Sequence, residues 1–144
     1  MDEHSQEYIA FMQKAEALQA LWVPGVGDFI WCGEQGFYGL WIIVPRSEDN
    51  SPFGLAGLDH SGFFGVFSDL DELRPFVRGI GVWLPSLFQL IRIIEGAGCS
   101  WERLPGCEWI LYDRILRERA TVIEDDDMLA AAKLAAREIG RAHV

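Results

Sequence analysis

The chain has 144 residues, of which half are hydrophobic and 24% are charged, and its formal net charge is −10. This composition excludes widespread disorder and predicts one conventionally packed domain over residues 1–144. The acidic balance makes nucleic-acid binding unlikely, because neutralising phosphates requires a basic surface.

The first predicted element is an amphipathic helix over residues 5–21, where apolar side chains recur at helical intervals. Pro24 should follow its end, because proline disfavours helical backbone in the residue before it. Strands over 28–32 and 37–44 flank a turn at 33–36 and predict a β-hairpin. The second strand is apolar on both faces, so we expect both faces to be covered.

The next part of the chain is less regular. The polar segment 45–52 predicts an exposed loop, and the glycine-rich segment 53–62 predicts a mobile stretch. A third strand is expected over 63–67. Ser68 is the candidate N-cap of a short helix over 69–76.

Residues 79–98 carry the strongest local pattern. An extended stretch at 82–84 leads into Pro85, which suits the first turn of a helix over 86–95 that ends at glycines. This helix is apolar on nearly every side, so we expect it to be the most buried helix of the fold. The apolar run 79–91 is shorter than the ~20 residues that a membrane span needs, so no membrane association is expected.

Two interpretations are open for the segment that follows. Residues 108–112 and 120–123 have strand character and predict a hairpin, whereas 109–117 could instead be helical. Periodicity alone does not separate these alternatives. The final helix, over 125–141, starts with aspartates and ends near arginines, which is the order that a helix dipole favours.

Two Trp-x-Pro units, Trp22-Val23-Pro24 and Trp83-Leu84-Pro85, stand at the boundaries of different elements. As boundary residues, the two tryptophans could pack near each other. Together the elements predict an α+β fold with a mainly antiparallel sheet of three to five strands, packed by three main helices. Strand order does not follow from the pattern.

Cysteine and histidine are too sparse for a zinc site of the usual spacing, and no C-x-x-C pair occurs. The chain has three of each: Cys32, Cys99, Cys107, His4, His60 and His143. We therefore predict no metal and no other cofactor. The acidic run 124–127 is interpreted as a helix cap rather than a cation site. The lack of a signal-peptide pattern predicts reduced thiols and a cytoplasmic location.

His60 is the only candidate catalytic residue. It lies in Asp59-His60-Ser61, which contains the residue types of a hydrolase triad. Triads are assembled across a fold, however, and no G-x-S-x-G motif surrounds Ser61. A solvated turn is therefore favoured over an active site, and a noncatalytic role over an enzyme.

The candidate binding residues are apolar side chains in or beside the glycine-rich segment: Phe53, Leu55, Leu58, Phe63 and Phe64. Apolar residues on a loop can form a partner-binding patch. They can also fold back as a lid on the sheet, and this alternative is favoured because isolated exposed apolar groups are disfavoured.

Three short motifs carry a family resemblance. Trp22-Val23-Pro24 precedes Gly27-Asp28, Trp83-Leu84-Pro85 opens a helix that contains Gln89-Leu90, and Asp126-Asp127 begins a helix with an A-x-x-L pattern. In this order the chain resembles small uncharacterised proteins of bacterial phages and prophages. The resemblance implies a compact α+β fold and a phage or mobile-element context, and it carries no catalytic residues.

The sequence thus predicts a cytoplasmic, noncatalytic protein-interaction module of phage or mobile-element origin. Two alternatives are open: a small hydrolase-type enzyme that uses His60, and an acidic protein that blocks a nucleic-acid-binding partner. The sequence determines neither the substrate or partner nor the oligomeric state.

Overall fold

The computed structural model describes residues 5–33, 38–45, 52–57, 63–67, 69–114 and 117–142. They form helices and antiparallel sheets, so the predicted α+β class is confirmed. The chain divides into two compact units, which are described separately below. They are the terminal unit (residues 1–20 and 85–144) and the central unit (residues 21–84). The single domain expected from the sequence stays a prediction.

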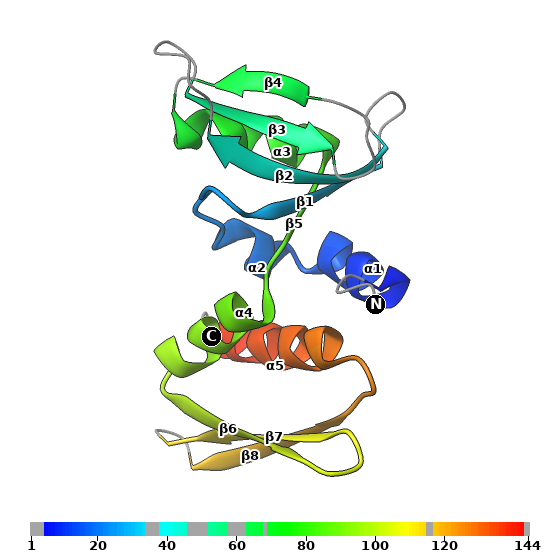
Figure 1. The fold of residues 1–144 in the computed structure, drawn as a ribbon. Coiled ribbons are helices and arrows are strands. Elements are labelled where there is room, and N and C mark those ends of the chain that lie inside the picture. Colours follow the sequence, from blue (N-terminus) through cyan, green and yellow to red (C-terminus); the bar gives the residue numbers. More distant parts are fainter. Residues whose placement is uncertain are drawn as a thin grey trace. The chain divides into compact units, whose positions relative to one another are not determined.

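Among the described residues, the central unit contains a five-stranded antiparallel sheet in the order β4-β3-β2-β1-β5 (Figure 1). Its strands are β1 (Phe29–Cys32), β2 (Gly39–Pro45), β3 (Phe53–Gly57), β4 (Phe63–Phe67) and β5 (Gly81–Leu84). The expected hairpin is confirmed, with Ile30 of β1 opposite Trp41 of β2. Residues 53–57 form the strand β3 instead of the irregular chain expected there. Hydrogen bonding to both β2 and β4 holds this segment extended although it contains glycines.

Burial alternates along the second strand of the hairpin, although its composition is apolar throughout. Trp41 and Ile43 of β2 are buried, whereas Leu40, Ile42 and Val44 are half-buried. Both faces of β2 are therefore covered, one fully and the other in part.

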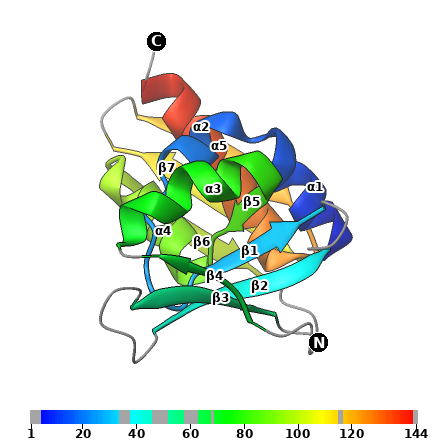
Figure 2. The same cartoon turned by 90° about the horizontal axis from the view of Figure 1, so that it is seen from above.

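A short 3₁₀ turn, η1 (Leu70–Glu72), leads into α3 (Leu73–Ile80), which lies beside β5 (Figure 2). The Asp69 side chain caps η1 by accepting a hydrogen bond of 3.1 Å from the Glu72 N–H. Ser68, the cap expected from the sequence, lies outside the described residues. The helix continues past Pro75 instead of ending near it, because a proline in the first turn removes no intrahelical hydrogen bond.

The two tryptophans of the Trp-x-Pro units stack on each other, as the sequence suggested. The ring centres of Trp22 and Trp83 are 6.1 Å apart and their planes are inclined by 18°. The Trp22 indole N–H also donates a 2.9 Å hydrogen bond to the buried Asp28 carboxylate, which accepts a second one from the Gly25 N–H. The guanidinium of Arg74 donates to the carbonyl of Trp22. The first Trp-x-Pro unit is thus anchored at both its side chain and its backbone.

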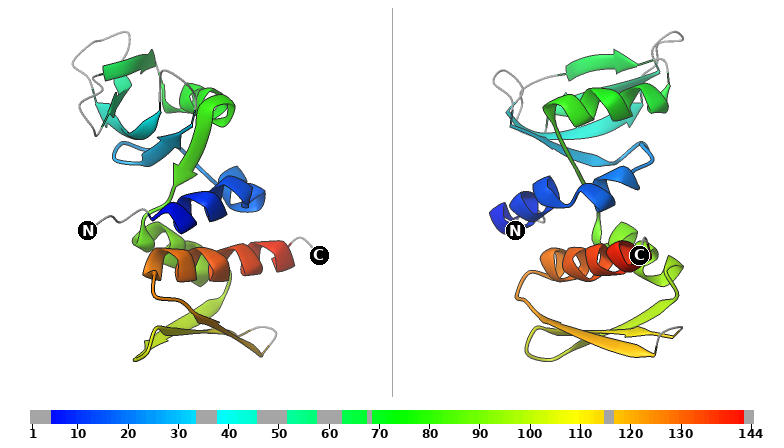
Figure 3. Two further views of the ribbon diagram at one scale, coloured as in Figure 1. Left: turned by 90° about the vertical axis from the view of Figure 1, so that its right-hand side faces the viewer. Right: turned by 180° about the vertical axis from the view of Figure 1, so that it is seen from behind.

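The terminal unit places helices on one face of a three-stranded antiparallel sheet, β6-β7-β8, within the described residues (Figures 1 and 3). Its elements are α1 (Gln6–Lys14), α2 (Glu16–Ala20), α4 (Leu87–Gly96), β6 (Cys99–Leu104), β7 (Glu108–Asp113), β8 (Glu118–Ile123) and α5 (Asp127–Ala142). The hairpin interpretation of 108–123 is confirmed and the helical one is wrong. The first helix breaks at Ala15 into α1 and α2, and the sequence pattern did not predict β6.

The most buried of these helices is α5, and the expectation for α4 is wrong. Phe88 of α4 is 68% exposed, and only Leu90 and Ile94 of that helix are buried. Small side chains in α5 let α1, α2, α4 and β8 pack closely around it. The buried residues of α5 are therefore largely alanines, and a pattern of large apolar residues does not reveal them. Within the described part of the chain, no helix has the length and apolar character needed to cross a lipid bilayer.

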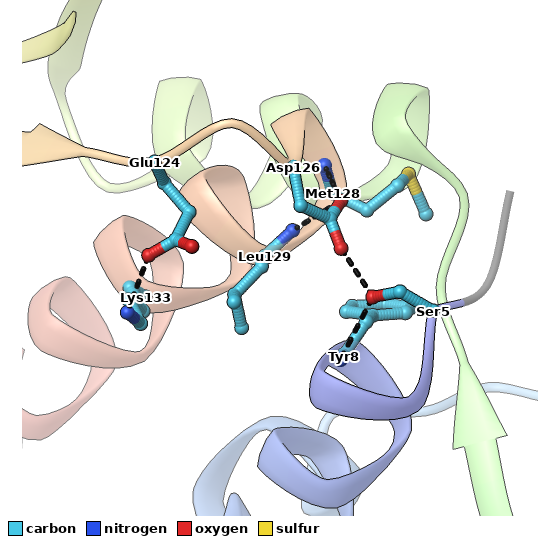
Figure 4. A network of polar contacts seen from close by, with 7 residues as sticks. All are labelled: Ser5, Tyr8, Glu124, Asp126, Met128, Leu129 and Lys133. Atoms are coloured by element: carbon cyan, nitrogen blue, oxygen red, sulfur yellow. Dashed lines mark hydrogen bonds and ion pairs between the residues drawn. The ribbon is translucent and has the colours of Figure 1, made fainter. Parts of the chain in front are cut away.

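One polar network holds the starts of α1 and α5 together (Figure 4). Ser5 caps α1 by accepting a hydrogen bond from the Tyr8 N–H, and its hydroxyl donates to the Asp126 carboxylate. Asp126 in turn accepts hydrogen bonds from the Met128 and Leu129 N–H groups at the start of α5. Each side chain therefore satisfies helix-terminal donors that would otherwise lack partners.

Candidate functional site

The inner face of the β6-β7-β8 sheet, which we define as the face toward α4 and α5, places a thiol beside a carboxylate. Cys99 at the start of β6 is paired with Asp113 at the end of β7. Directly paired residues project from the same face of a sheet, because side chains alternate along each strand. Leu111, two residues before Asp113, is fully buried and identifies this face as the one that packs against the helices.

Helix α5 adds a second carboxylate to this pair. The Cys99 Sγ atom, an Asp113 carboxylate oxygen and a Glu138 carboxylate oxygen all lie within 4.8 Å of one another. Asp113 is 6% exposed and Glu138 is 4% exposed. We call these three residues the thiol–carboxylate cluster.

The cluster concentrates acidic groups where water is scarce. Within the described part of the chain, the Glu138 carboxylate forms no hydrogen bond or ion pair. The ion pairs between described side chains join Arg103 to Asp127 and Lys133 to Glu124. Burying a carboxylate is unfavourable unless a cation or a hydrogen-bond donor compensates for the lost hydration. The site therefore has an electrostatic preference for a cation.

A cavity of about 320 Å³ has one member of the cluster, Cys99, in its lining. It is lined by Glu95, Gly98, Cys99, Ser100, Trp101 and Arg114. The Trp101 ring stacks on the ring of Trp109 with a centre-to-centre distance of 5.3 Å, which holds this wall in place.

The outer face of the same sheet, which we define as the face opposite α4 and α5, has a different character. No helix of the described part of the terminal unit lies on it (Figure 3). By the strand register, the outer-face residues are Ser100, Glu102, Leu104, Glu108, Ile110, Tyr112, Arg119, Thr121 and Ile123. An antiparallel sheet face that contacts only water is expected to be mostly polar. Four of these nine side chains, counted from that register, are instead large and apolar or aromatic.

Two of the four apolar or aromatic side chains of the outer face are open to solvent. Ile123 is 73% exposed and Tyr112 is 45% exposed, whereas Ile110 at the centre of the face is only 9% exposed. Glu102 and Glu108 stand beside Ile110 in the register, so the apolar centre has carboxylates around it.

The binding residues expected from the sequence are only partly described. Leu55 is 1% exposed in β3, and Phe53 is half-buried at the start of that strand. The backbone of Phe63 and Phe64 forms β4, but their side chains lie outside the described residues, as does Leu58. The catalytic candidate His60 also lies outside them, so its role stays a prediction.

The acidic run before α5 is occupied by structural contacts, as the sequence suggested. Asp126 caps the helix, Glu124 pairs with Lys133 at 2.8 Å, and Asp127 accepts hydrogen bonds from Arg103 and from the Trp109 indole. The remaining member, Asp125, accepts a hydrogen bond from the Cys107 thiol, and this bond is the main reason that the pKa of Cys107 is raised.

Sequence reasoning missed the thiol–carboxylate cluster for an identifiable reason. The spacing of zinc ligands and the acidic run 124–127 are local patterns, whereas Cys99, Asp113 and Glu138 come from three separate elements. A predicted β6 would have placed Cys99 opposite Asp113, but the polar stretch 100–103 hides the strand pattern of that segment.

Comparison of the chain with protein-family models, curated proteins and solved structures finds no match.

Proposed function

We propose that this chain is a noncatalytic protein-interaction module that binds its partner with the outer face of the β6-β7-β8 sheet. The observation that carries the proposal is the exposure of Ile123 and Tyr112 beside Ile110 on a sheet face without a covering helix. Exposed apolar clusters with a polar border are typical of protein-binding surfaces, and tyrosine is favoured in them.

Charge indicates the chemistry of the partner. Glu102 and Glu108 border the apolar centre, Arg119 is the one basic residue on the face by the register, and the whole chain has a net charge of −10. Complementary charge speeds association and disfavours wrong partners. The expected partner is therefore a protein with an apolar patch bordered by lysine or arginine.

Two substitutions at Ile123 test both parts of this proposal. Ile123→Lys and Ile123→Glu remove the same apolar contact but add opposite charges. A partner captured from the source cell and then purified should bind both variants at least tenfold more weakly than the unmodified chain, which corresponds to about 1.4 kcal/mol. Ile123→Lys should bind the partner more weakly than Ile123→Glu, because the added lysine repels the basic border of the partner's patch.

Phe88→Ser is the matched control, because Phe88 is a similarly exposed apolar residue that belongs to α4 instead of the outer face. This control should bind as tightly as the unmodified chain. The proposal fails if Phe88→Ser weakens binding as much as the Ile123 variants do. It also fails if the captured species is a second copy of this chain, as sedimentation would show.

The phage or mobile-element origin and the cytoplasmic location are part of this proposal. The origin is supported by the motif resemblance, and the location stays an expectation.

A further inference from the structure

We propose that Cys99, Asp113 and Glu138 form a binding site for one divalent transition-metal ion, with Zn²⁺ as the best-fitting ion. This site lies on the inner face of the β6-β7-β8 sheet, so the inference is independent of the partner-binding function proposed for the outer face.

The three donor atoms lie close enough together to surround one ion, because no two of them are more than 4.8 Å apart. In a tetrahedral site with Zn–S and Zn–O bonds about 2.0–2.3 Å long, the donor atoms are about 3.3–3.8 Å apart. Rotations of the Asp113 and Glu138 side chains would bring the donor atoms closer by up to about 1.5 Å. No change in the backbone pairing of β6 with β7 is needed.

The electrostatics of the cluster favour an ion of charge +2. Two carboxylates and a thiol meet where Asp113 and Glu138 are almost wholly removed from water. The Glu138 carboxylate points into this cluster, and no other described residue forms a hydrogen bond or ion pair with it. A bound cation replaces the missing hydration and offsets the repulsion between the acidic groups.

The donor types select the ion. Thiolate is a soft ligand that Mg²⁺ and Ca²⁺ avoid, whereas carboxylate is a hard ligand that Cu⁺ disfavours. A mixed set of one sulfur and two oxygens suits a borderline ion, and Zn²⁺ accepts both donor types in tetrahedral geometry.

Three protein donors leave the fourth position of such a tetrahedron open. Cys99 lines the cavity of about 320 Å³ together with Glu95 and Arg114. Three protein ligands with an open position are typical of zinc sites that bind water or a small exogenous ligand. We therefore expect the ion to enter past Cys99 and a water molecule to serve as the fourth ligand.

The test is metal binding by the full chain after removal of metals with a chelator. Zn²⁺ affinity is measured by competition with a chromophoric chelator, in the presence of excess Mg²⁺ and Ca²⁺ to occupy surface carboxylates. Co²⁺ serves as the spectroscopic probe, because a thiolate ligand gives Co²⁺ a strong charge-transfer absorption in the near ultraviolet. The unmodified chain should bind one Zn²⁺ and show this absorption.

Two isosteric variants identify the ligands. Cys99→Ser should abolish the Co²⁺ charge-transfer absorption, and Glu138→Gln should weaken Zn²⁺ binding about 100-fold or more. Cys107→Ser is the matched control and should retain both signals, because Cys107 lies at the opposite end of the β6-β7 hairpin. Circular dichroism confirms that each variant is folded. Glu138→Gln removes a buried charge without a change of shape, so this variant keeps the test valid if Cys99→Ser fails to fold.

Three results overturn the proposal. The first is a folded, metal-free chain that binds no Zn²⁺ in the presence of Mg²⁺ and Ca²⁺. The second is Zn²⁺ binding that Glu138→Gln leaves unchanged. The third is a charge-transfer absorption that Cys107→Ser abolishes and Cys99→Ser retains.

Discussion

Tyr112 and Asp113 are neighbours in β7, yet they project from opposite faces of the β6-β7-β8 sheet. Tyr112 is 45% exposed on the outer face, whereas Asp113 is buried on the inner face beside Cys99. Strand alternation therefore gives one short strand two roles, because one side chain is available to a partner and the next belongs to the thiol–carboxylate cluster.

The Asp28 carboxylate should be a strong determinant of stability in the central unit. In Asp28→Ala, the Trp22 indole N–H and the Gly25 N–H both lose their acceptor. A buried donor left without a partner costs about 1–3 kcal/mol, and the part-buried Gly25 N–H should cost less than the buried Trp22 N–H, so we expect a loss of about 2–4 kcal/mol in the free energy of unfolding. Urea denaturation measures this loss. The exposed Asp71 provides the control, and Asp71→Ala should change stability by less than about 0.5 kcal/mol.

Gly81 is required by the close approach of β5 to β1. A Cβ atom at this position would lie 2.1 Å from the Trp31 carbonyl oxygen, which is backbone and cannot rotate away. Gly81→Ala should therefore destabilise the chain by about 1–3 kcal/mol or more. A Cβ at Gly96 in α4 meets no atom within 4 Å, so Gly96→Ala should be neutral or stabilise by up to about 1 kcal/mol. Equal thermal shifts for the two variants would contradict this account.

Tyr8 should make stability fall at high pH. Burial, and secondly the charge of Asp126, raise the pKa of Tyr8 far above its usual value. The unfolded chain then releases its Tyr8 proton near pH 10 while the folded chain retains it. The raised pKa of Tyr8 therefore leaves the free energy of unfolding unchanged below about pH 10. Above that pH it lowers the free energy of unfolding by about 1.4 kcal/mol per pH unit.

Tyr8→Phe is the matched variant for this effect. It should be less stable at neutral pH, because the Pro85 carbonyl loses the 2.7 Å hydrogen bond from the tyrosine hydroxyl. Its stability should decline less steeply than that of the unmodified chain between about pH 10 and 11. Denaturant unfolding at each pH measures the two slopes, and parallel slopes would show that Tyr8 ionises freely in the folded chain.

Asp125 should slow the reaction of the Cys107 thiol with alkylating agents. The hydrogen bond to the Asp125 carboxylate is the first cause of the raised pKa of Cys107. In Asp125→Asn the pKa should fall toward the usual value, so more thiolate is present near pH 8 and alkylation is faster. Mass spectrometry of the Cys107 peptide follows the rate. Asp71→Asn should leave the rate unchanged, and an unchanged rate in Asp125→Asn as well would refute the assigned cause.

Much of the fold could be predicted from local sequence patterns. The β1-β2 hairpin, the Ser86 start of α4 and the acidic start of α5 each depend on signals within a few residues. These predictions agree with the structure because turns, caps and helix dipoles are local interactions.

The features that were missed depend on distant parts of the chain. Strand β3 contains two glycines and is ordered by neighbours on both sides, and α5 is buried through alanines because other helices approach it. The thiol–carboxylate cluster likewise needs β6, β7 and α5 to be placed together before its three donors can be recognised. No pattern within one segment contains that information.

The most direct test of the central claim is amide hydrogen exchange of the chain with and without its purified partner. The account predicts slower exchange on binding in β7 and β8, around Tyr112 and Ile123, with little change in the central unit. Slower exchange confined to residues 53–67, with none in β7 or β8, would contradict it and would favour the glycine-rich segment as the binding surface.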